Sequence, residues 1–231
     1  MIGHLASQFA ELSDRYSKGV LALSLGSGVF IGFGVGLLPH QLSDTQSTFT
    51  VFLAGSLMLG KVSSILVAVF LLLRLAFLGQ LELVHAQSEV EGAPYQGSLA
   101  GVMGQALQSL GQPAAHVFAC VWTGFIAWCL YLFACLAAYR LGLELMTPLS
   151  ATALFEDLLA GMSIFDLWRS LLRSLVVAYA LGWLAYTQSF IGSHFDGQSA
   201  QVITIRYMLA GGVLIAALEI VDTLLFFNAP L

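Results

Sequence analysis

The chain has 231 residues, of which 58% are apolar and only 9% are charged, and its formal net charge is −5. Several continuous apolar runs reach the roughly 20 residues with which an α-helix crosses a bilayer, so this composition excludes a soluble domain. The basic residues form no cluster that could follow a phosphate backbone, which excludes nucleic-acid binding. Because backbone groups in lipid must be satisfied within helices, we predict an all-α integral membrane protein.

The first 18 residues are predicted to form an amphipathic helix at the membrane interface. Apolar residues recur there at helical spacing, with polar residues between them. The apolar positions are Ile2, Leu5, Phe9, Leu12 and Tyr16. A secretory signal is the other interpretation, but no basic region stands at the start and the apolar run begins only after Lys18. We therefore expect residues 1–18 to form an uncleaved interfacial helix.

Residues 19–231 are predicted to form a single domain with five membrane-spanning helices. The predicted spans are residues 19–38, 49–78, 115–139, 167–188 and 207–228. Arg15 and Lys18 precede the first span, and the loop after it has no basic residue. This asymmetry places the N-terminus in the cytoplasm, and five spans then put the C-terminus on the outer side of the membrane. Arg74 and Arg206 agree with that orientation; the arginines that disagree are Arg140, Arg169 and Arg173.

Glycines recur every fourth residue in the first predicted span, at Gly28, Gly32 and Gly36. A face of small residues lets two helices approach closely. We therefore predict that this face packs against another helix. The repeat is compatible with packing inside one chain and with packing between two copies.

Residues 80–114 are predicted to form a cytoplasmic connector between the second and third spans. The connector contains a short amphipathic helix followed by Gly111 and Pro113, which are typical of the end of a helix. The residues that define this helix are Gln105, Leu107, Gln108 and Leu110. It is either a docking helix for a partner protein or an ordinary surface connector.

Charged residues lie inside the second and fifth predicted spans. Lys61 lies in the second, and Glu219 and Asp222 lie one helical turn apart in the fifth. Such residues cost about 2.5–3.5 kcal/mol each on insertion scales, so they mark a pathway, a pocket or a buried pair. We expect Lys61 to face Glu219 or Asp222; the alternative is that Lys61 snorkels from a tilted or broken helix. With Arg74 and Arg206, these residues are the candidates for a substrate pocket or a gate.

The sequence contains no recognisable catalytic or metal-binding pattern. The segment Gly55 to Val62 resembles a phosphate-binding loop, but Val62 stands where a magnesium-binding Ser or Thr is required. The five histidines form no i, i+4 pair, and the three cysteines fall in one apolar run, as small buried hydrophobic residues do. We expect no metal site, no cofactor and no enzymatic activity in this chain. A lipid-modifying enzyme would need His, Asp or Glu converging at one membrane face.

Residues in and just before the fourth and fifth predicted spans stand in a defined order. They are Asp166-Leu167, Arg173-Ser174, Thr204, Arg206, Glu219 and Thr223, within Asp166 to Tyr186 and Ser199 to Phe227. This order resembles the C-terminal half of the MlaE/YrbE family of ABC-transporter permeases, which serve MCE-type lipid transport. Further resemblance lies in Ser27 to Gly32, in the spacing from Lys61 to Arg74, in Glu82, and in Gln105 to Pro113, which is similar to the family helix that docks on the ATPase.

The resemblance implies an MlaE-like permease of the bacterial inner membrane that moves phospholipid or another hydrophobic substrate between the inner and outer membranes. The implied partners are a second permease in a homo- or heterodimer, a cytoplasmic ABC ATPase that binds ATP and magnesium, and a periplasmic MCE protein. Three positions depart from the family, because Lys61 replaces a pocket glutamate and Gln105 and Gln108 replace docking glutamates. These departures favour the alternative of a degenerate, structural permease-like subunit without ATPase coupling, in a heterodimer with a second permease.

Overall fold

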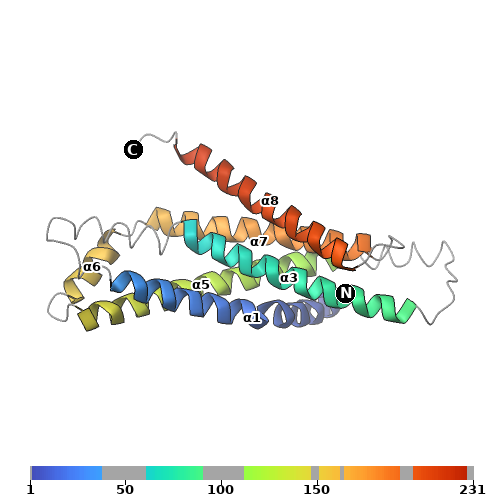
Figure 1. The fold of residues 1–231 in the computed structure, drawn as a ribbon, viewed down its shortest axis with the longest axis horizontal. Helices are drawn as coiled ribbons and strands as arrows, with labels where there is room; N and C mark the ends of the chain where they lie inside the picture. The colour runs from blue at the N-terminus through green and yellow to red at the C-terminus, as the bar shows by residue number, and fades with distance from the viewer. Residues whose placement is uncertain are drawn as a thin grey trace. The chain divides into compact units, whose positions relative to one another are not determined.

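The computed structural model describes residues 2–37, 61–90, 112–146, 151–161, 164–192 and 200–227, and nearly all of them are helical. The helices are α1 (Ile2–Gly36), α3 (Lys61–Val90), α5 (Gln112–Met146), α6 (Ala151–Gly161), α7 (Ile164–Gly192) and α8 (Ala200–Phe227), as drawn in Figure 1. The described residues contain no strand. The predicted all-α class is therefore confirmed.

Among the described residues, four helices are long and apolar enough to cross a membrane. Their described ranges are Ala6–Gly36, Ala114–Met146, Ile164–Thr187 and Thr204–Leu224. They overlap the first, third, fourth and fifth predicted spans, so the multi-pass membrane character is confirmed. The predicted second span, residues 49–78, is described only from Lys61 onward, and Val62–Leu78 is an apolar helix within the described part of that span.

Three helix positions differ from the sequence prediction. Helix α3 continues to Val90, inside the predicted connector, because an isolated glycine at 79 does not end a helix and the next turn signal is Gly92-Ala93-Pro94. Pro113 lies in the first turn of α5, where proline is favoured, so it opens this helix. Helix α6 was not predicted, because its 11 residues are too few to cross a bilayer and include two acids.

The contacts of the chain define two compact units. Unit 1 comprises Met1–Tyr16, Leu71–Trp122 and Val177–Leu231. Unit 2 comprises Ser17–Phe70 and Thr123–Val176. Helices α1, α3, α5 and α7 therefore each contribute residues to both units.

In unit 2, α1 packs against α5 along its glycine face. A Cβ atom at Gly28 would lie 2.5 Å from the carbonyl oxygen of Tyr131. A Cβ atom at Gly36 would lie 2.7 Å from the carbonyl oxygen of Tyr139, and Gly32, between them, is equally close to the α5 backbone. Only residues without a side chain allow this approach. The glycine face thus packs within one chain, and the two helices are parallel because the contact advances along both in the same direction.

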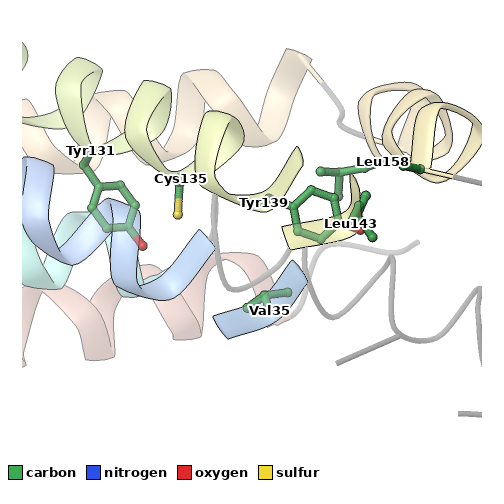
Figure 2. Close-up of a cluster of buried hydrophobic side chains, with 7 residues drawn as sticks. Val35, Tyr131, Cys135, Tyr139, Leu143 and Leu158 are labelled. Atoms are coloured by element: carbon green, nitrogen blue, oxygen red, sulfur yellow. The ribbon is translucent and has the colours of Figure 1, made fainter. Parts of the chain in front are cut away.

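The core of unit 2 lies beside this glycine face (Figure 2). Its buried side chains are Val35 of α1, Tyr131, Cys135, Tyr139 and Leu143 of α5, and Ala151 and Leu158 of α6. The α5 residues recur every fourth position, so one face of that helix supplies most of the core. Helix α6 completes the core by burying Leu158 against it, with the side chain 2% exposed.

In unit 1, α5 and α7 pack in opposite directions. The rings of His116 and Tyr186 lie 6.3 Å apart, and a Cβ atom at Gly182 would lie 3.2 Å from the Cβ of Cys120. The contact moves forward along α5 and backward along α7, so these helices are antiparallel. Helix α8 packs against α3 at Gly211, where an added Cβ would overlap a leucine of α3.

Candidate functional site

Two groups of predicted site residues cannot be compared with the structure. Lys61 is the first residue of α3, and its side chain lies outside the described residues, so its pairing with Glu219 or Asp222 stays a prediction. The docking residues also lie outside the described part; they are Gln105, Leu107, Gln108 and Leu110.

Glu219 and Asp222 lie on the inward side of α8. Both side chains are half-buried, and their side of the helix continues that of Tyr207 and Ile215, which are buried. The Thr223 hydroxyl donates a hydrogen bond of 2.7 Å to the carbonyl oxygen of Glu219. The opposite side of α8 is exposed and apolar, with Ile205, Leu209, Val213, Ile220 and Leu224. The two carboxyl groups therefore lie on the side of α8 that packs against the protein.

Arg206 is not close to these acids. It is exposed near the start of α8. A rise of 1.5 Å per residue puts it about 20 Å from Glu219 along the helix axis. An exposed arginine near the end of an apolar helix is typical of a snorkelling side chain.

Arg74 binds the end of the first half of α1. Its Nε and Nη2 atoms donate hydrogen bonds of 3.0 and 2.8 Å to the carbonyl oxygen of Arg15. That carbonyl lies in the last turn before the non-helical residue Lys18, where carbonyls lose their regular helical partners. A guanidinium group at a helix C-terminus satisfies such a carbonyl and interacts favourably with the helix dipole. Arg74 therefore caps this helix end, a role that its position in the second span did not reveal.

An aromatic cluster lies next to this cap in unit 1. The Tyr16 hydroxyl hydrogen-bonds to Nδ1 of His116, and the His116 ring also lies beside Tyr186. Tyr186 in turn meets the edge of Trp183 at a centroid distance of 6.2 Å. The only sequence signal for this cluster is weak, namely that Tyr16 belongs to the apolar side of the predicted amphipathic helix. Its partner could not be predicted, since it lies 100 residues further along the chain.

Unit 2 contains a hydrogen-bonded group of buried polar side chains. The hydroxyls of Ser63 and Ser170 share a hydrogen bond of 2.9 Å, and the indole Nε1 of Trp128 donates one of 3.0 Å to the Ser170 hydroxyl. This group joins α3, α5 and α7 within an apolar environment, where such bonds hold helices together. Sequence reasoning missed it, because serine and tryptophan are ordinary residues in an apolar run.

Unit 2 also contains further buried hydroxyl groups outside this hydrogen-bonded group. The buried polar residues are Ser24, Ser63, Ser64, Thr123, Ser170 and Ser174, and every one belongs to unit 2. The hydroxyls of Ser24, Thr123 and Ser174 have no hydrogen-bond partner among the described residues. A buried hydroxyl without a partner costs about 1–3 kcal/mol, so unit 2 tolerates an unfavourable term at these positions.

The geometry offers hydrogen-bonding and acidic groups inside apolar helices. Within the described ranges, no group of three or more His, Cys, Asp or Glu side chains could hold a metal ion. Comparisons with family models, curated proteins and solved structures found no match. The residues themselves must therefore carry the functional argument.

Proposed function

We propose that the chain is the permease subunit of an MCE-associated ABC transporter similar to the MlaE/YrbE family, in the bacterial inner membrane. It moves phospholipid or another hydrophobic substrate between the inner and outer membranes. One observation carries the proposal, namely that three polar residues of the resemblance are buried or half-buried in apolar helices. Ser174 is 1% exposed, and Arg173 and Glu219 are half-buried. Such residues in a membrane-spanning helix usually serve a substrate, a gate or a buried partner.

The parallel packing of α1 and α5 supports five crossings of the bilayer. When two parallel helices both cross a membrane, the chain between them must cross back. Helix α3 is the described helix between them, and its 30 residues make it about 45 Å long. Five crossings put the termini on opposite sides, so a cytoplasmic N-terminus near Arg15 and Lys18 gives a periplasmic C-terminus.

In this proposal the chain binds no nucleotide. A partner ATPase binds ATP and magnesium in the cytoplasm, a periplasmic MCE protein carries the lipid onward, and a second permease completes the lipid cavity. Glu219 and Asp222 are the proposed pocket or gate residues, since Arg74 caps the first half of α1 and Arg206 lies about 20 Å from Glu219 along α8. Residues 105–112 are the proposed ATPase-docking helix.

Purification from the native operon in mild detergent, with one tag on this chain, tests the proposal. Mass spectrometry of the purified complex should identify an ATPase, an MCE protein and bound phospholipid. Purification of the chain alone, or with unrelated proteins, would contradict the transporter assignment.

A second candidate function is a structural permease-like subunit that has lost ATPase coupling. The glutamines at 105 and 108 favour it, because they replace the acidic residues expected in a docking helix. The same purification separates the two functions. A second, intact permease bound to the ATPase would support the structural subunit, whereas an ATPase that cross-links directly to residues 105–112 would contradict it.

A further inference from the structure

The two halves of α1 are separated by a break in the helix. Lys18 has an extended backbone (φ −60°, ψ 117°), and Gly19 has a φ of 88°, which residues with a side chain rarely adopt. The contacts change at the same place, because Met1–Tyr16 belongs to unit 1 and Ser17 begins unit 2. Nothing lies within 4 Å of a Cβ built at Gly19. The break therefore has two properties that a hinge needs. A glycine can change its backbone dihedral angles, and there is open space around it.

Two described contacts hold the turn of residues 2–17 that lies next to this hinge. Arg74 donates both of its hydrogen bonds to the carbonyl oxygen of Arg15, and Tyr16 bonds to His116. Tyr16 is 5% exposed and is the only buried residue among the described side chains of this segment. One polar turn thus supplies the fully buried part of the attachment.

The described side chains of residues 6–15 are exposed or only partly covered by protein. Phe9 and Leu12, on the apolar side, are half-buried, and the polar side is exposed, with Glu11 paired to Arg15 at 2.9 Å. Residues 1–18 contain two acidic and two basic residues, so they have no net charge. An amphipathic helix of this kind binds a membrane surface through its apolar area, without a need for anionic lipid.

We propose that residues 2–17 are a hinged strap with two positions. In the docked position, described by the structure, Arg74 and His116 hold its last turn against unit 1. In the released position the segment rotates about Lys18 and Gly19, and its apolar side, with Phe9 and Leu12, enters the surface of a zwitterionic phospholipid bilayer. We call the bonds from Arg74 and His116 to the last turn of the strap the clasp. The strap does not depend on the transport function, because it requires only the clasp, the hinge and a membrane.

Spin-label distances in the full chain, reconstituted in phosphatidylcholine nanodiscs, test the strap. One label replaces Ala10 and a second replaces Phe118 of α5, since both are exposed and belong to unit 1. The native cysteines are changed to alanine; they are Cys120, Cys129 and Cys135. The combined Arg74→Gln and Tyr16→Phe variant should raise the ratio of long to short distances about tenfold or more, because charge-assisted hydrogen bonds are lost. Tyr16→Phe alone keeps the buried ring and should give a smaller change in the same direction.

Arg140→Gln is the matched control for the clasp. Arg140 binds Glu144 on its own helix at 3.0 Å and does not touch the strap, so the distances should be unchanged. A label at Phe9 reports the released position, where it should become more accessible to oxygen and remain protected from a water-soluble nickel complex. Unchanged distances in the combined variant would overturn the clasp, and a nickel-accessible label would overturn the membrane-bound position.

Discussion

The two halves of α1 are held by different kinds of contact. The described contacts of residues 2–17 include hydrogen bonds of polar groups in the last turn, at Arg15 and Tyr16. Residues 20–36 lie against α5 through glycines that bring the two backbones together. Hydrogen bonds to side chains can be exchanged for bonds to water or lipid headgroups at a modest net cost, whereas close backbone packing has no such substitute. One helix thus combines an attachment that can be released with one that is permanent.

The largest effect is expected from filling the glycine face. A Cβ atom at Gly32 would lie 2.8 Å from the backbone Cα and carbonyl carbon of Cys135, so Gly32→Ala should force α1 and α5 apart. We expect a loss of about 3 kcal/mol in the free energy of unfolding. SDS-induced unfolding in bicelles measures it.

Gly34→Ala is the control for that substitution. Gly34 lies on the same helix, but nothing is within 4 Å of its added Cβ. The unfolding midpoint should stay the same or rise slightly, since alanine favours a helix by up to about 1 kcal/mol over glycine. Equal losses for the two variants would mean that α1 does not pack on α5 through this face.

The next effect concerns the buried serine group of unit 2. Ser170→Ala removes the bond to Ser63 and leaves the indole N–H of Trp128 without its partner. We expect the free energy of unfolding to fall by about 2 kcal/mol, because a buried hydrogen-bond donor is left unsatisfied. Ser174→Ala, one turn further along α7, should cost less or stabilise the protein, because that hydroxyl has no partner among the described residues. Thermal unfolding of the two variants in the same detergent compares them directly.

A smaller effect is expected at the hinge itself. Gly19→Ala introduces a side chain at a φ of 88° and should destabilise the break by about 1 kcal/mol. Gly26→Ala adds the same methyl group in open space within the helical part of α1 and should be neutral or stabilising. Bicelle unfolding free energies should separate the two variants; no difference would mean that the break at Gly19 is not maintained in solution.

The smallest effect is expected for a surface ion pair. Arg140 and Glu144 are one turn apart on α5, and both side chains are about half exposed. Arg140→Gln should change the free energy of unfolding by about 0.5 kcal/mol or less. The Arg140 guanidinium also lies 5.6 Å from the centre of the Phe155 ring. If Arg140→Gln lowers the free energy of unfolding by more than Ser170→Ala does, Arg140 stabilises the protein more than an exposed ion pair would.

Hydropathy was sufficient to predict the helical class and the long apolar helices, because both depend on local composition. It did not predict α6 or the extension of α3, whose residues are neither long apolar runs nor clear breakers. The partners of Arg74, His116 and Ser170 could not be predicted, because each lies on another helix and depends on packing. The glycine repeat predicted a packing face, but the sequence could not say that α5 would occupy it.

The parallel pairing of α1 with α5 also constrains how the protein is made. Gly28 and Tyr131 are separated by nearly half of the chain, so α1 is synthesised and inserted long before its partner exists. At about 5–20 residues per second, the ribosome needs roughly 5–20 s to reach α5. During that interval the glycine face of α1 is open to other helices in the membrane, so biogenesis requires either a protein that shields this face or a pairing that reverses when α5 arrives.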